Sequence, residues 1–206
     1  MIIHNLKLIF NTINNMKLIL LRHADRYESP QFLTELTGVG FEQADELVEI
    51  LPQNIDIIFS SPFLRTIQTI FPYCKKYNKK INIENSLYEH CQSPYFNISN
   101  IRHNVSEFIN SHPKLQKIYY KDYKSGFLSS NIRLDPELYI LKNRVTPFIY
   151  KLIHKYKNTN KQILLVTHMS ICNLILGLFN KKTKLTDSFP VAHFGIVNVD
   201  TNFKYF

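Results

Sequence analysis

A short apolar run over residues 16–21, M-K-L-I-L-L, ends directly in Arg22-His23-Ala24-Asp25-Arg26. A continuous Leu/Ile run of this length is typical of a strand that is buried on both faces in a parallel sheet. Open α/β sheets bind ligands at the carboxyl ends of their strands, so His23 is expected at a ligand site. The two flanking guanidiniums should lower the pKa of His23 and favour its neutral, nucleophilic ring, and arginine side chains also suit a phosphate group.

Strands and helices alternate along the rest of the chain. Short runs rich in Ile, Leu, Val or Phe predict further strands at residues 55–59, 81–87, 163–167 and 194–199.

Three helices are expected between these strands. Apolar residues recur at helical spacing between Thr37, a suitable N-cap, and Pro52, and again after Ser60-Ser61-Pro62. A third helix is expected over residues 136–157, with Asp135 as its cap and a kink at Pro147. The alternation predicts an α/β fold of three layers, with a mostly parallel central sheet and helices on both faces.

The length of 206 residues suits one domain with a sizeable core. We assign residues 16–206 to that domain and expect a helical or irregular insertion at about residues 92–134, where prolines and tyrosines break the alternation. Residues 1–15 form an N-terminal extension that the sequence leaves open as an edge strand, an amphipathic helix or sequence upstream of the true start.

The composition restricts the partners and the compartment. Lysine and arginine outnumber aspartate and glutamate by 25 to 16, and the resulting net charge of +9 favours anionic ligands of any kind. The cysteines at positions 74, 91 and 172 are odd in number and contain no close-spaced pair, which favours free thiols in a reducing, cytoplasmic setting. No apolar run approaches the roughly 20 residues of a membrane span, so we expect neither a membrane partner nor export.

Polar side chains follow three of the expected strands. Arg22, His23 and Arg26 follow the first strand, Ser60, Ser61 and Arg65 follow the second, and His168 follows the strand at 163–167. Taken singly, a strand-end histidine or a helix arginine is most often structural. Because parallel strands end at one edge of a sheet, we expect these side chains to converge there.

The same residues resemble the histidine phosphatase superfamily (branch 1), which has the phosphoglycerate mutase-like fold. The family's Arg-His-Gly signature appears as Arg22-His23-Ala24. Its other elements appear in the family's order as Leu36-Thr37-Gly38-Val39-Gly40-Phe41-Glu42-Gln43-Ala44, Ser60-Ser61-Pro62-Phe63-Leu64-Arg65-Thr66-Ile67-Gln68-Thr69 and Val166-Thr167-His168. Arg26 together with Ser86-Leu87-Tyr88-Glu89 looks most like the phosphatase domain of the suppressor of T-cell receptor signalling proteins.

The resemblance implies a phosphatase that needs neither a metal nor a cofactor. His23 would attack phosphorus and form a phosphohistidine, while Arg22, Arg65, His168 and Arg26 would hold the phosphate oxygens. Glu89 would protonate the leaving group, which requires a raised pKa, and the neighbouring His90 is the competing candidate for this role.

The sequence departs from the family pattern in two places. Ala24 replaces the usual glycine, a small change that should keep the strand end open. Met169-Ser170 replaces the frequent Gly-Gly after His168, and Ser170 is expected to cap the next helix.

Two alternatives to the phosphatase remain open at this point. The first is a phosphoglycerate mutase or sugar bisphosphatase on the same fold, although the serine and Trp-Asn that follow the mutase signature have no counterpart here. The second is a non-catalytic protein that binds phosphorylated ligands, or nucleic acid through Tyr119, Tyr120, Lys121, Tyr123 and Lys124. We expect a phosphorylated small molecule or phosphoprotein as the substrate and no nucleic acid partner, and a homodimer is left open.

Overall fold

The computed structural model of the protein describes residues 16–29, 31–92, 111–179 and 184–199. The N-terminal extension at 1–15 and residues 93–110 of the insertion lie outside the described residues. Five strands form one sheet in the order β3-β2-β4-β1-β5. Strands β1 to β4 pair in parallel, and β5 is antiparallel to β1. The strands are β1 Met16–Arg22, β2 Ile57–Ser60, β3 Ile81–Ile83, β4 Gln162–Thr167 and β5 Phe194–Val199.

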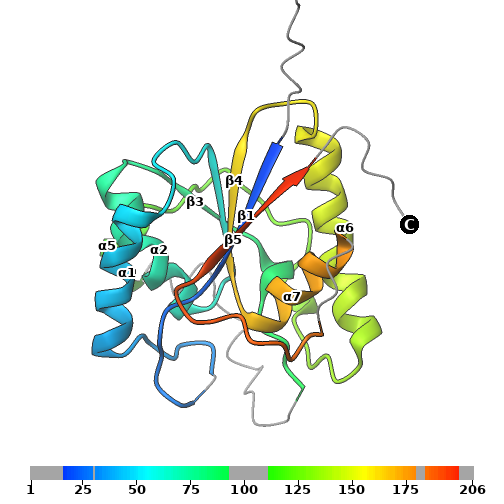
Figure 1. Cartoon of the computed structure of the whole chain (residues 1–206). Helices are drawn as coiled ribbons and strands as arrows, with labels where there is room; N and C mark the ends of the chain where they lie inside the picture. The colour runs from blue at the N-terminus through cyan, green and yellow to red at the C-terminus, as the bar shows by residue number, and fades with distance from the viewer. Residues whose placement is uncertain (1–15, 30, 93–110, 180–183, 200–206) are drawn as a thin grey trace, which may run out of the picture.

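Helices cover both faces of this sheet, as Figure 1 shows with the sheet seen from its edge. Helices α1 (Gly38–Ile50) and α2 (Leu64–Lys76) lie on one face, and α6 (Leu138–Tyr156) and α7 (Met169–Leu178) lie on the other. The predicted three-layer α/β fold with a mostly parallel sheet is therefore confirmed. Within the described residues no helix is long and apolar enough to cross a membrane.

Strand β1 is buried on both faces because its side chains alternate between two hydrophobic cores. Ile19 and Leu21 pack in the core beneath α1 and α2, whereas Leu18 and Leu20 pack in the core beneath α6 and α7. Burying each such side chain contributes about 1.5–3 kcal/mol. The continuous apolar run thus makes β1 an inner strand and fixes where it ends.

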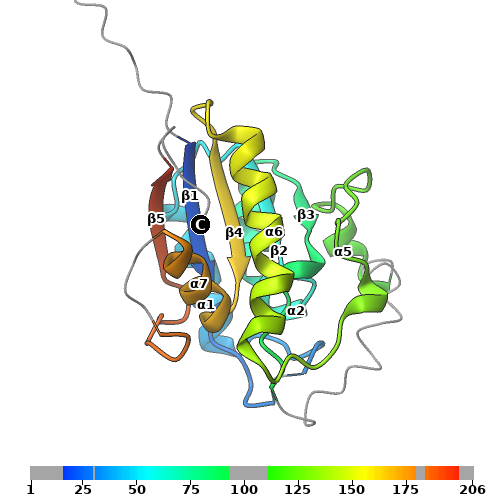
Figure 2. The same ribbon diagram turned by 90° about the vertical axis from the view of Figure 1, so that its right-hand side faces the viewer.

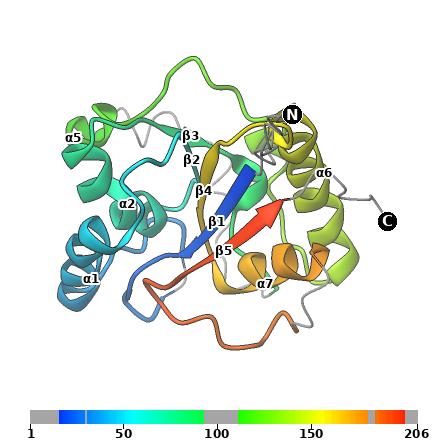
Figure 3. The same ribbon diagram turned by 45° about the horizontal axis from the view of Figure 1, so that its top comes forward.

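The described part of the insertion, residues 111–134, is mostly irregular and contains the short helices α5 (Pro113–Gln116) and η2 (Ser129–Asn131). It lies beside β3 (Figure 2), where Ile81 donates to the carbonyl of Ile118 and accepts from the amide of Tyr120. The segment after α5 then passes to the α6 side of the sheet (Figure 3). The insertion therefore covers the backbone edge that β3 would otherwise expose.

Three local predictions need correction. The strand expected at 81–87 stops at Ile83, because the Glu84 carboxylate accepts from the amide of Ser86 and turns the chain into the 3-10 helix η1 (Asn85–Leu87).

The expected caps of the last two helices are also wrong. Helix α6 begins at Leu138 with no side-chain cap, because Asp135 is paired with Arg144, and it continues as one helix through Pro147. Helix α7 begins at Met169, directly after His168, so Ser170 lies inside the helix and does not cap it. The N-cap predicted at Thr37 is present, since its side chain accepts from the amide of Gly40.

Candidate active site

The carboxyl ends of β1, β2 and β4 meet at the lower edge of the sheet in Figures 1 and 2. The amide of His23 donates to the carbonyl of Thr167 at 3.0 Å, and the amide of Ser61 donates to the carbonyl of Val166 at 2.9 Å. These bonds extend the strand pairing by one residue. They set His23, Ser61 and His168 side by side, as the strand order requires.

The His23 ring is buried at the base of this edge, with 2% of the residue exposed. Its Nδ1 donates to the carbonyl of Ala24 at 2.7 Å, and its centroid lies 5.2 Å from that of the His168 ring. Burial, reinforced by the charge of Arg65, holds the pKa of His23 well below its ordinary value. The direction agrees with the sequence-based expectation, but its main cause is burial and not the flanking arginines.

Arg65, from the first turn of α2, is completely buried beside the two histidines. Its Nη1 donates to the carbonyl of Gln31 at 2.9 Å, and its Nη2 lies 3.2 Å from Oε2 of Glu89. Burial lowers the pKa of Arg65 to about 10, so the guanidinium stays charged at neutral pH. A fixed positive charge therefore stands inside the site.

Glu89 contributes the negative charge of the cluster, and 16% of its side chain is exposed. Its Oε2 lies 3.2 Å from Nδ1 of His168 as well as from Arg65, and its Oε1 accepts from the amide of His90. Burial opposes ionisation, but His168 and Arg65 hold the pKa of Glu89 well below its ordinary value. The raised pKa that the acid role requires is therefore not a property of the unliganded site, because the nearby donors favour the carboxylate.

His90, the competing acid candidate, faces away from this cluster. Its Nε2 donates to the carbonyl of Asp135 at 3.0 Å. The structure thus brings Glu89, and not His90, next to His23 and Arg65.

His168 connects Glu89 to the end of β2. Its Nε2 lies 2.9 Å from the hydroxyl oxygen of Ser61, and burial lowers its pKa to about 4, which keeps the ring neutral. The tautomer with hydrogen on Nδ1 suits Glu89 and Ser61, since Nδ1 donates to Glu89 and Nε2 accepts from Ser61. Nη2 of Arg65 lies 3.4 Å from the same Nδ1 and then donates to Glu89 instead.

Arg22 and Arg65 each have a hydrogen-bond donor without a partner in the described structure. Arg22 Nη1 donates to the carbonyl of Phe189 at 2.6 Å, but the Nε atoms of Arg22 and Arg65 are buried without a hydrogen-bond partner in the described structure. A buried donor without a partner costs about 1–3 kcal/mol. An anion bound between these side chains would offset that cost.

Arg26 lies differently from the other two arginines. Its Nη1 donates to the carbonyls of Tyr27 and Glu28 in its own loop. Its charge is nevertheless close enough to lower the pKa values of Arg22 and Arg65, after the larger effect of burial. Arg26 therefore stands at the border of the site, and within the described residues it forms no ion pair with the His23 cluster.

The remaining motif residues hold the loop that follows His23. Thr69 Oγ1 accepts from the amide of Ala24, Gln43 accepts from the amide of Asp25, and the hydroxyl of Thr37 donates to the Asp25 carboxylate. The structure thus gives these polar residues bracing roles, which the sequence analysis did not assign.

Gly40 lets the first turn of α1 approach this loop closely. A Cβ on Gly40 would lie 2.0 Å from the carbonyl oxygen of Asp25, which is backbone and cannot move aside. The glycine of the Leu-Thr-x-x-Gly motif is thus explained by contact with the residue two positions after His23.

The sequence analysis also missed Arg144, which lies beneath Glu89. From α6, Arg144 forms a buried ion pair with Asp135 at 2.5 Å and donates to the carbonyls of Ser86 and Tyr88. Its guanidinium carbon lies 3.4 Å from the centre of the Tyr88 ring. The sequence does contain a signal for Arg144: a charged residue stands directly before Val145, within the apolar face of the predicted helix.

His23, Glu89 and His168 also form the one group in the described residues that could hold a metal ion, with ligand atoms within 4.8 Å of one another. The surroundings favour a different ligand. Glu89 is already bound by Arg65, His168 and a backbone amide, and Arg65 places a buried positive charge against it. Buried guanidiniums suit an anion better than a cation.

The fold is similar to that of solved structures described as phosphatases. An α-ribazole phosphatase from Shigella flexneri superposes with a TM-score of 0.61 at 18% identity, over 91% of this chain and 93% of that one. A phosphoserine phosphatase mutant from Entamoeba histolytica gives 0.56 at 20% identity, over 91% and 96%. A mycobacterial glucosyl-3-phosphoglycerate phosphatase gives 0.59 at 16% identity, over 87% and 91%.

Sequence comparison gives the family directly. No curated protein sequence matches the chain. The family model of the histidine phosphatase superfamily (branch 1), in contrast, matches residues 18–203, which include every side chain of the cluster around His23. The chain therefore belongs to branch 1 of the histidine phosphatase superfamily.

Proposed function

We propose that the protein hydrolyses phosphate monoesters through a phosphohistidine formed on Nε2 of His23. The observation that carries this proposal is the hydrogen bond from Nδ1 to the carbonyl of Ala24, which keeps the proton on Nδ1 and leaves a lone pair on Nε2. Burial keeps the ring neutral. Nε2 forms a bond to phosphorus as the bond to the leaving oxygen breaks, and water then hydrolyses the phosphohistidine and releases phosphate.

Arg22, Arg65 and His168 would bind the three non-bridging oxygens of the phosphoryl group, with Arg26 as a further ligand. The buried, unpartnered Nε atoms of Arg22 and Arg65 support this assignment, since an oxyanion is the acceptor they lack. Phosphoryl transfer depends mostly on positioning and charge stabilisation. Fixed guanidiniums can supply both, so we propose that catalysis needs no metal.

Glu89 would transfer the protons. Because its carboxylate is ionised in the unliganded site, it must gain a proton when substrate binds, and the phosphate is the natural source. Phosphate monoesters have a second pKa near 6, so a monoanionic ester carries one proton into the site. Glu89 then passes that proton to the leaving oxygen and later takes one from the attacking water.

A substrate screen tests the mechanism. We expect His23→Asn to abolish phosphate release from aryl and alkyl phosphates, and EDTA to leave the wild-type rate unchanged. Glu89→Gln should lose about 10²–10⁴ in rate on alkyl phosphates and far less on aryl phosphates, whose leaving groups need little protonation. Equal losses on both classes would remove Glu89 from the acid role, and inhibition by EDTA would contradict a metal-free mechanism.

The same screen distinguishes a phosphatase from the mutase alternative. It includes 3-phosphoglycerate with the 2,3-bisphosphate as primer. Mutase turnover far above phosphate release would overturn the phosphatase proposal.

The proposed substrate is a phosphorylated small molecule or a phosphoprotein. The small-molecule option is supported by the structural relatives, described as phosphatases of α-ribazole phosphate, phosphoserine and glucosyl-3-phosphoglycerate. The proposed closeness to the suppressor of T-cell receptor signalling group rests on two motif residues, Arg26 at the border of the site and Glu89 within it. The buried, free thiols of the three cysteines support a cytoplasmic location.

A further inference from the structure

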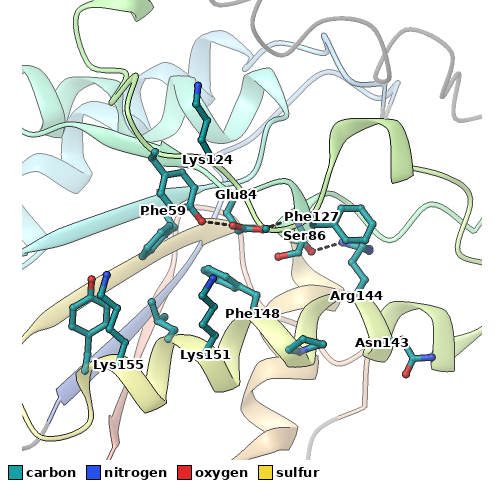
Figure 4. A pocket seen from close by; sticks show the side chains of 15 residues that line it. Phe59, Glu84, Ser86, Lys124, Phe127, Asn143, Arg144, Phe148, Lys151 and Lys155 are labelled. Atoms are coloured by element: carbon teal, nitrogen blue, oxygen red, sulfur yellow. Dashed lines mark hydrogen bonds between the residues drawn. The ribbon is translucent and has the colours of Figure 1, made fainter.

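A cavity lies on the α6 side of the sheet, away from His23. Its volume is about 440 Å³, within the range of small-molecule sites. It is enclosed by β2, the segment after β3, the insertion and α6, as Figure 4 shows. None of the side chains that surround His23 lines it, so it is separate from the candidate active site.

Aromatic rings make up much of the cavity wall. Phe59 of β2 packs edge to face against Phe148 of α6 and Tyr123 of the insertion, with ring centroids 5.3 Å and 5.4 Å away. Tyr156 and Phe127 complete this lining. A wall of this kind suits a flat, apolar body.

The charge at the cavity is positive. Lys124 from the insertion and Lys151 and Lys155 from α6 line it, and none of the three forms an ion pair within the described residues. The one acidic side chain in the lining, Glu84, is already bound by the hydroxyls of Tyr123 and Ser125 and by the amide of Ser86. Arg144 is neutralised by Asp135. In Figure 4 Lys151 and Lys155 reach from α6 toward the cavity, where the one carboxylate is already bound.

The inner end of the cavity holds an unsatisfied polar group. Ser86 is 1% exposed, and its hydroxyl has no hydrogen-bond partner in the described structure. In Figure 4 it lies at the end of the cavity opposite Lys155, next to Arg144, whose Nε is also without a partner. A buried hydroxyl without a partner costs free energy that a polar ligand atom would recover.

We infer that this cavity is a second binding site, for a small organic anion with a flat apolar body. The body would lie against the rings of Phe59, Phe148 and Tyr156, on the side that faces the cavity. Its anionic group would lie near Lys151 and Lys155, and a polar atom would reach the hydroxyl of Ser86. The inference does not depend on the proposed reaction, because no residue that touches the phosphate takes part.

Titration of the full chain with 8-anilinonaphthalene-1-sulfonate tests the inference, since this fluorescent probe is a flat aromatic anion. We expect saturable, one-site binding. Lys151→Glu with Lys155→Glu should weaken it about tenfold or more, because both charges near the sulfonate are reversed. Lys142→Glu is the matched control: it changes an exposed lysine of the same helix outside the cavity and should leave the affinity unchanged.

Ser86→Ala separates binding from folding. Removing an unpartnered hydroxyl should leave the melting temperature equal or higher, while the probe binds roughly threefold to tenfold more weakly. Absence of saturable binding would overturn the inference, as would an equal loss in Lys142→Glu. Binding that Arg22→Ala abolishes and the lysine changes leave intact would place the probe in the active site and overturn it too.

Discussion

The ion pair between Arg144 and Asp135 should be a major source of stability beneath the active site. Replacing Arg144 with methionine keeps much of the side-chain volume and removes the charge. Asp135, 0% exposed, would then be left as a buried carboxylate with the amide of Cys91 as its remaining partner, and the carbonyls of Ser86 and Tyr88 would lose their donors.

The size of the loss follows from these contacts. Breaking a buried ion pair by removing one partner costs about 3–5 kcal/mol, because the other charge stays desolvated. We therefore expect Arg144→Met to lower the free energy of unfolding by about 3–5 kcal/mol. Asp135→Asn with Arg144→Met removes both charges, and the introduced amide oxygen can still accept from the amide of Cys91. That double variant should recover about 1–3 kcal/mol relative to the sum of the single losses.

Urea unfolding at 15 °C, followed by circular dichroism, measures the free energy of unfolding of the wild type, Arg144→Met, Asp135→Asn and the double variant. Arg133→Met is the matched control, because Arg133 is exposed and its loss should cost less than about 0.5 kcal/mol. A loss below about 1 kcal/mol for Arg144→Met, or strict additivity in the double variant, would refute the assigned role of the pair.

Three further outcomes follow from the site. Since the pKa of His168 falls from about 6.5 in the unfolded chain to about 4 in the fold, the unfolded state binds the proton first. Stability should therefore decrease by about 3 kcal/mol as the pH falls from 6.5 to 4, and urea unfolding should show a shallower decrease for His168→Asn. Gly40→Ala should destabilise the protein by roughly 1–3 kcal/mol and reduce turnover, whereas Gly38→Ala, whose Cβ meets nothing within 4 Å, should be neutral or slightly stabilising in thermal unfolding. Equal effects of the two changes would contradict the close approach of α1 to Asp25. In steady-state kinetics Arg22→Ala should lower kcat/KM by roughly 10- to 100-fold, as expected for a charged hydrogen bond, and Arg26→Ala by less than about tenfold. A larger loss for Arg26→Ala would show that Arg26 leaves its loop carbonyls to bind substrate.

Much of this fold follows from local sequence patterns. The apolar runs that become β1 and β4 are buried on both faces, so their strand character and their ends are both visible in the sequence. Because those ends meet at one edge, the approach of His23 to His168 could be expected before any geometry was known. The strand predicted over residues 81–87 ends early, since the hydrogen bond that Glu84 accepts from the amide of Ser86 turns the chain despite the apolar alternation.

The electrostatics of the site were less accessible from the sequence. The low pKa of Glu89 depends on distances to Arg65 and His168, which come from two different elements far away in the chain. Asp135 is a good helix cap by type, but its pairing with Arg144 competes for the same carboxylate. The secondary-structure propensity of a short segment carries no information about partners that are distant in the sequence.

The central claim is that His23 carries the phosphoryl group. Rapid quenching of the wild-type protein with an aryl phosphate labelled with ³²P tests it most directly. We expect label on the protein within the first turnover, bound in an acid-labile, alkali-stable linkage that maps to His23 and is absent in His23→Asn. Label on another residue, or phosphate release by His23→Asn at the wild-type rate, would contradict the account.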